Sequence, residues 1–123
     1  MVEDFLRGYI EAFNARDGAR IAALYNVPCV TMRADGSIHA FTSRDEIQAF
    51  FQRLAETYYR DGCRGWHYSN LEVTPLGARS VIATLDWEMR RADASTIRRW
   101  RQSYHLVAAD GGLRVLASTI HFG

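Results

Sequence analysis

The segment from Val81 to Leu106 constrains the fold of this chain more than any other, because apolar and polar residues alternate along both of its halves. In the first half every second residue from Val81 is apolar, and the second half alternates around Trp100 and Tyr104. A period of two is typical of a β-strand with one buried face. We therefore predict two long antiparallel strands joined by a turn at 92–95.

The register of this hairpin follows from the size and charge of the side chains. With Ala92 opposite Ser95, uncharged residues, several of them aromatic, face each other on one side of the hairpin. Acidic residues face basic ones on the other side, which is a stabilising arrangement. The pairs are Trp87 with Trp100, Ala83 with Tyr104, Leu85 with Gln102, Glu88 with Arg99 and Asp86 with Arg101. A shift of one residue would set tryptophan against charge, so we expect this register.

Two longer helices and one short helix are predicted in the first half of the chain. Apolar residues at steps of three and four indicate an amphipathic helix from Val2 to about Asn14. Asp17 is placed to cap a second helix that carries Ile21, Leu24 and Tyr25 and is stopped by Val27-Pro28. In the third, Ser43 and Glu46 form a capping box, and Gly62 ends the helix.

The remaining segments are typical of strands. Residues 29–33 and 37–41 flank the turn dipeptide Asp35-Gly36 and predict a short hairpin. Beyond the third helix we expect four strands, at 65–75, 80–92, 95–109 and 113–122, with a bulge near Ser69-Asn70. A three-residue loop before the last strand would place Leu116 opposite Leu106 and Phe122 opposite Trp100.

One face of the predicted sheet collects aromatic side chains, and the helices must bury their apolar stripes against it. That face carries Trp66, Tyr68, Trp87, Met89, Trp100, Tyr104, Ile120 and Phe122, with polar atoms at Gln102 and Ser118. Helices laid across a curled sheet cover only part of its concave side and leave a pocket at the open end, with Tyr9 and Phe13 above it. Buried hydroxyl, indole and amide groups need partners, which favours a ligand pocket over a plain core.

The opposite, convex face is mildly apolar around the Asp86/Arg101 and Glu88/Arg99 pairs. Its other residues are Ile82, Thr84, Ser103, His105, Val107, Val115, Ala117 and Thr119. A fully solvated sheet face is usually more polar than this. We expect a homodimer through this face; the alternative is a mildly apolar surface on a monomer.

Composition excludes several classes of partner. A chain of 123 residues predicts a single domain, 1–123, and a net charge of +1 gives no field that attracts nucleic acid. No apolar run is long enough for a membrane span, no signal peptide is seen, and Cys29 and Cys63 lack disulfide or CxxC spacing, so we expect a cytoplasmic protein. The four histidines show no metal-ligand spacing, and no motif indicates a metal or cofactor.

Three local stretches carry a resemblance to a known family. They are 9–17 (YIEAFNARD), 43–47 (SRDEI) and 110–121 (DGGLRVLASTIH). With the order of elements above, the chain resembles the nuclear transport factor 2-like superfamily, which includes SnoaL-like proteins and ketosteroid isomerases. The resemblance covers essentially the whole chain and implies an α+β, cystatin-like cone, a curled mixed or antiparallel sheet wrapped around three N-terminal helices. It implies fold more than function, because this fold hosts enzymes, carriers and adaptors.

The resemblance also bears on catalysis. Tyr9 falls where ketosteroid isomerases keep a tyrosine that donates to the developing oxyanion. Their general-base aspartate falls here on Arg33, which cannot shuttle protons near neutral pH. Their second acid falls at or beside Ser103, on a strand without a carboxylate. Two of three roles are missing, which disfavours steroid isomerisation by that route.

Two functions remain on the sequence alone. The first is binding of a small apolar or aromatic molecule in the cone, with isomerisation, cyclisation or dehydration as the chemistry if it catalyses; the second is a non-catalytic dimeric protein-interaction module. Catalytic candidates are Tyr9, Tyr104 and Asp35, the last being either a base paired with Arg33 at the pocket mouth or an ordinary turn residue. The expected ligand-binding residues are Tyr9, Phe13, Arg33, Tyr68, Trp87, Trp100, Gln102, Tyr104 and Ser118.

Overall fold

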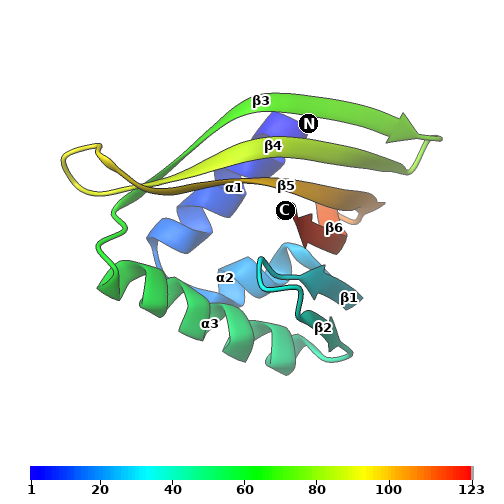
Figure 1. Ribbon diagram of the computed structural model, residues 1–123. Coiled ribbons are helices and arrows are strands. Elements are labelled where there is room, and N and C mark those ends of the chain that lie inside the picture. Colours follow the sequence, from blue (N-terminus) through cyan, green and yellow to red (C-terminus); the bar gives the residue numbers. More distant parts are fainter. Residues whose placement is uncertain (123) are drawn as a thin grey trace.

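A computed structural model describes residues 1–122 and shows one open, mixed sheet with helices on one face (Figure 1). The elements are α1 (Val2–Asn14), α2 (Gly18–Ala23), β1 (Tyr25–Met32), β2 (Ile38–Phe41), α3 (Arg44–Arg60), β3 (Gly65–Leu76), β4 (Ser80–Arg90), β5 (Thr96–Ala109) and β6 (Gly112–Ile120). The strand order is β2-β1-β6-β5-β4-β3, and β1 and β6 are parallel while the other neighbours are antiparallel. The predicted α+β architecture is confirmed. None of the helices described is long and apolar enough to cross a membrane.

The register predicted for the β4–β5 hairpin is confirmed through its centre, where Trp87 lies opposite Trp100 and Asp86 opposite Arg101. Near the tip the pairing shifts by one, because Arg90 lies opposite Thr96 and the Arg91 amide donates to the Ser95 carbonyl. Arg91, not Ala92, therefore meets Ser95. The extra residue on β5 is a bulge next to the turn.

The bulge predicted in β3 is also confirmed. The β3–β4 pairing is interrupted between Ser69 and Glu72, and Asn70 adopts a left-handed conformation with φ of 53°. Asparagine tolerates this conformation better than most residues. The bulge lets Trp66 and Tyr68 share a face before the strand changes parity.

The predicted course of β6 is wrong at both ends. The connection is the two-residue turn Asp110-Gly111, shorter than expected, and a bulge then places Val115 opposite Leu106 in place of Leu116. Val115 is consequently fully buried in the core rather than on the convex face. β6 ends at Ile120, and Phe122 is 60% exposed, so it does not extend the aromatic face opposite Trp100.

Tyr25 belongs to β1, whereas the sequence predicts it in the second helix. α2 ends at Ala23, and the Leu24 carbonyl accepts a hydrogen bond from the Val115 amide, which draws the chain into the sheet. Tyr25 then lies beside Val115 in the parallel β1–β6 pair. Tertiary pairing therefore overrides the local helical periodicity, and the helix ends well before Pro28.

The helix starts are formed as predicted. The Glu46 amide donates to Ser43 Oγ at 3.2 Å, and the Glu46 carboxylate accepts from the Ser43 hydroxyl at 3.2 Å and from the Thr42 amide at 3.1 Å, so Ser43 and Glu46 together cap α3. Asp17 caps α2 by accepting from the Arg20 amide at 3.1 Å.

The convex face carries the two predicted acid-base pairs. Arg101 donates to Asp86 at 2.9 Å and to Glu72 at 3.0 Å. Glu88 accepts from Arg90 at 3.0 Å, from Arg99 at 3.3 Å and from the Thr96 hydroxyl. These donors, with the hydrogen bond from Arg90 first, lower the pKa of Glu88 to about 2.

We expect Glu88→Gln to flatten the acid dependence of stability. A carboxylate with a depressed folded-state pKa stabilises the protein fully above its ordinary value of 4.5, and this contribution is lost as the pH falls toward about 2. Thermal melts across this range should therefore show a smaller decline for Glu88→Gln than for the wild type. Glu72→Gln, at a carboxylate that is 76% exposed, is the matched control and should follow the wild type. Identical acid profiles for all three proteins would contradict the role of Glu88.

Candidate functional site

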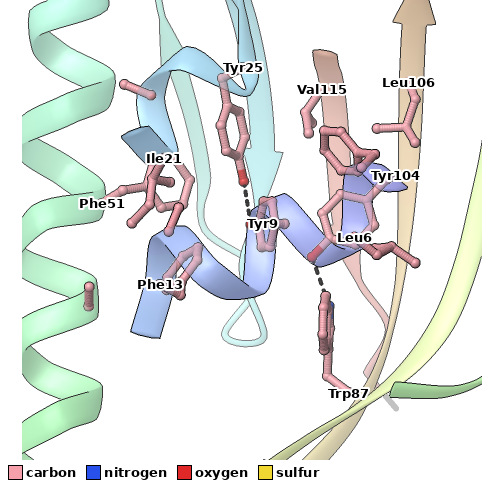
Figure 2. Close-up of a cluster of buried hydrophobic side chains, with 14 of the residues drawn as sticks. Leu6, Tyr9, Phe13, Ile21, Tyr25, Phe51, Trp87, Tyr104, Leu106 and Val115 are labelled. Atoms are coloured by element: carbon pink, nitrogen blue, oxygen red, sulfur yellow. Dashed lines mark hydrogen bonds between the residues drawn. The ribbon is translucent and has the colours of Figure 1, made fainter. Parts of the chain in front are cut away.

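A hollow lies between helices α1 and α3 and the concave face of the sheet. It is lined mostly by aromatic side chains, which include all three tryptophans of the chain. The lining residues are Tyr9, Ile10, Phe13, Arg33, Phe51, Leu54, Tyr58, Trp66, Trp87, Trp100, Gln102 and Tyr104. Figure 2 shows how Tyr9 and Phe13 of α1 point between Phe51 of α3 and the strands that carry Trp87 and Tyr104.

Helical and strand periodicity place these side chains. Tyr9 and Phe13 are four residues apart and share one face of α1, and Leu54 and Tyr58 have the same spacing on α3. On the sheet, residues two apart share a face, which brings Trp100, Gln102 and Tyr104 of β5 to one side. The walls therefore come from elements whose positions are set by their own packing.

The free space in the hollow is narrow. It amounts to about 370 Å³ with the open mouth included, and little of it is wide enough to hold a water molecule. Ring contacts explain this, because Trp66 meets Trp87 and Trp100 edge to face at centroid distances of 5.9 and 5.7 Å, and Tyr9 stacks on Trp87 at 6.0 Å. The aromatic side chains therefore fill most of the hollow, and a bound ring requires them to move apart.

Most polar atoms of the aromatic wall are already paired. The Trp87 indole N–H donates to the Tyr104 hydroxyl at 2.8 Å, and the hydroxyls of Tyr9 and Tyr25 lie 2.7 Å apart (Figure 2). Trp100 donates to Gln102 Oε1 at 2.9 Å. Among residues 1–122 no protein acceptor pairs with the amide nitrogen of Gln102, and this nitrogen is not one of the buried unpaired atoms, so it keeps contact with solvent and can donate to a ligand.

The buried tyrosines act as hydrogen-bond groups and not as bases. Burial, above all, raises the pKa of Tyr9, Tyr25 and Tyr104 well above the ordinary value of 10.0. All three phenols therefore stay protonated at neutral pH. Tyr9 and Tyr104, two of the catalytic candidates, can donate or accept a hydrogen bond but cannot remove a proton from a substrate.

Arg33 brings the one cationic side chain into the described lining. It is half-buried, and its Nη2 donates to the Tyr58 hydroxyl at 3.0 Å. Its backbone is held by the β1–β2 turn, where the Arg33 amide donates to the Ser37 carbonyl at 2.9 Å. Among residues 1–122, the lining of the hollow contains no aspartate, glutamate or histidine.

Three of the predicted site residues lie outside this lining. Asp35 sits in the exposed turn, where its carboxylate accepts from the Ser37 amide at 2.9 Å, so of its two predicted alternatives the ordinary turn residue is found and the pairing with Arg33 at the pocket mouth is not. β1 ends at Met32, and the turn sends these two side chains apart. Ser118 is buried in a hydrogen bond with Thr31 at 2.8 Å, and Tyr68 contacts the edge of Trp87 without reaching the hollow.

The other predicted residues come together as expected in space, and five lining residues were not foreseen as site residues. Those five are Ile10, Phe51, Leu54, Tyr58 and Trp66. The apolar stripe of α3 indicated that Leu54 and Tyr58 are buried, but it did not indicate which part of the sheet they face. In residues 1–122 no three histidine, cysteine, aspartate or glutamate side chains are grouped so as to hold a metal ion.

Solved structures with the same fold come from several bacteria. Aln2 from a Streptomyces species aligns with a TM-score of 0.79 at 17% identity, over 98% of this chain and 86% of that one. A domain of unknown function with a cystatin-like fold from Nostoc punctiforme gives 0.76 at 20% identity, over 97% and 73%. A ketosteroid isomerase-like protein from Erwinia carotovora gives 0.69 at 17%, over 96% and 90%. At these identities the likeness establishes the fold alone.

A sequence-family model described as NTF2-like protein (DUF6841) matches residues 1–122. The search of curated proteins gave no match. The cystatin-like architecture that the family resemblance implies is therefore confirmed both by the family model and by the solved structures.

Proposed function

The chain belongs to the NTF2-like proteins of family DUF6841, and from this premise we propose that it binds a small, flat, mostly apolar molecule in the hollow of its cone. The observation that carries the proposal is the concentration of all three tryptophans around a hollow that also contains Arg33 and the unpaired amide of Gln102. Sites for small molecules combine apolar walls with a few such polar groups.

Binding is favoured over proton-transfer catalysis. Isomerisation, cyclisation or dehydration without a cofactor needs a group that takes a proton near neutral pH. The lining offers phenols with raised pKa values and a guanidinium, and neither serves as a base. If the protein catalyses, Tyr9 and Tyr104 would orient or polarise the substrate, and the substrate itself would have to supply the base.

A titration with cinnamamide, a neutral and flat probe, tests the proposal. Two-dimensional NMR resolves the three indole N–H signals, and we expect those of Trp66 and Trp100, which are half-buried at the hollow, to shift with added probe. Ile10→Phe adds bulk to the lining and should weaken the shifts several-fold. Ile82→Phe makes the same change at a half-buried position of the convex face and should leave them intact. Equal behaviour of both variants, or unmoved indole signals, would count against binding in the hollow.

A dimeric interaction module is the second candidate. The convex face carries both signs of charge, in Asp86/Arg101 and Glu88/Arg99, beside a row of hydroxyl groups at Thr84 and Ser103. A face with both charges can complement a copy of itself across a two-fold axis, so we propose a homodimer there. Sedimentation velocity over a range of concentrations should give the dimer mass, and a monomer throughout would refute it.

We also propose that the protein acts in the cytoplasm. Cys29 and Cys63 are both free and buried. Unpaired thiols are typical of a reducing compartment. We place the binding role in the cytoplasm on this ground.

A further inference from the structure

Arg33 enters a mostly apolar hollow and, unlike the arginines that form ion pairs, has no carboxylate partner. Within residues 1–122 the ion pairs involve Arg7, Arg20, Arg90, Arg99 and Arg101. All of these pairs lie outside the described lining of the hollow. The hydrogen bond from Arg33 to Tyr58 goes to a neutral oxygen and leaves the charge uncompensated.

Arg33 is half-buried, so water reaches its free donors when no ligand is bound. An anionic ligand that replaces this water would pair with the charge, which arginine keeps at any ordinary pH. The guanidinium has five N–H donors, of which the described contacts occupy one. The remaining donors form a planar fork that fits the two oxygens of a carboxylate.

The fork is held in place before any ligand arrives. The turn after β1 fixes the backbone through the hydrogen bonds from the Arg33 amide to Ser37 and from the Gly36 amide to Arg33, each 2.9 Å long. Tyr58 of α3 fixes the side chain from the other wall. A donor that is already ordered loses little entropy when it binds.

The walls beside Arg33 select the rest of the ligand. Trp66 and Trp100 border the hollow and are half-buried, and the guanidinium of Arg98 lies 5.2 Å from the centroid of the Trp100 ring. From the unpaired guanidinium and these aromatic walls together, we infer that the ligand is a flat aromatic carboxylate whose ionised carboxyl group binds Arg33 in bidentate fashion; this inference rests on the proposed binding function.

Calorimetric titration of cinnamate against cinnamamide tests the inference, because the two probes match in shape and differ in charge. Charged hydrogen bonds to the fork should make cinnamate bind roughly ten- to a hundredfold tighter to the wild type. Arg33→Gln should reduce this preference to about twofold or less, and Arg33→Lys, which keeps the charge but loses the fork, should give an intermediate value. Arg99→Gln, on the convex face, is the matched control and should retain the full preference.

A pH series on the wild-type protein keeps the inference testable even if Arg33→Gln fails to fold. The preference for cinnamate should vanish as the pH falls below the pKa of the acid itself, since the carboxyl group is then neutral while Arg33 stays charged. If both probes bind equally at neutral pH, the carboxylate inference is overturned and the proposed binding function stands. If neither probe binds, the binding function itself is overturned.

Discussion

Replacing Trp87 with alanine is expected to lower the free energy of unfolding by about 3 to 5 kcal/mol. Trp87 is 3% exposed, stacks on Tyr9 and meets Trp66 edge to face. Truncation removes these contacts and leaves a cavity at the centre of the cone. It also removes the hydrogen bond that the indole N–H donates to the Tyr104 hydroxyl. The loss should be read from urea denaturation followed by circular dichroism.

Trp100→Ala provides the matched control, because Trp100 lies directly opposite Trp87 on the same face but is only half-buried. Its cost should be clearly smaller. The packing described here would be refuted if Trp87→Ala kept the denaturation midpoint of the wild type. It would also be refuted if Trp87→Ala lost less free energy of unfolding than Trp100→Ala.

Phe51→Ala is expected to cost a similar amount, again about 3 to 5 kcal/mol. Phe51 is 1% exposed and joins α3 to the sheet by stacking on Tyr25 at a centroid distance of 4.5 Å. It also meets the edge of Phe13 at 6.1 Å, so its removal loosens one wall of the hollow. The same denaturation measurement applies.

The neighbouring Phe50 gives a control on the same helix. Phe50 is half-buried and packs against His39 and Phe41 at the outer end of the sheet. Phe50→Ala should therefore cost much less than Phe51→Ala. Equal losses at the two positions would mean that α3 presents a different face to the sheet.

The central hairpin was predictable from sequence because two independent signals agree on its register. Slipping the strands by one residue would expose the tryptophans and separate Asp86 from Arg101 at the same time. The start of α3 was predictable for a similar reason, since Ser43, Glu46 and the apolar stripe that follows all indicate the same boundary. The structure of such segments can be predicted from sequence because local chemistry and long-range pairing indicate the same arrangement.

The errors arose where tertiary pairing departs from a regular pattern. The bulge at Leu116 reverses the side to which Val115 points, and no local feature of the sequence marks it. Tyr25 follows helical spacing but pairs with β6. A bulge or an early helix end changes the side chains that follow it, and periodicity alone cannot detect either.

The candidate site was predictable in part. Tyr9, Trp87 and Trp100 were expected at the hollow because α1 and the hairpin carry strong periodic patterns. Tyr58 was missed, because a buried stripe on a helix does not reveal which strand it faces. For Asp35 the sequence left two alternatives, and the turn dipeptide Asp35-Gly36 indicated the correct one, in which the carboxylate accepts from the Ser37 amide.

The most direct measurement is a crystal structure of the protein grown with cinnamate. The account predicts that the aromatic ring lies between the hollow's walls near Trp66 and Trp100, with both carboxylate oxygens within hydrogen-bond distance of the Arg33 guanidinium. It would be contradicted by a structure in which the probe occupies another surface while the tryptophans keep the hollow closed.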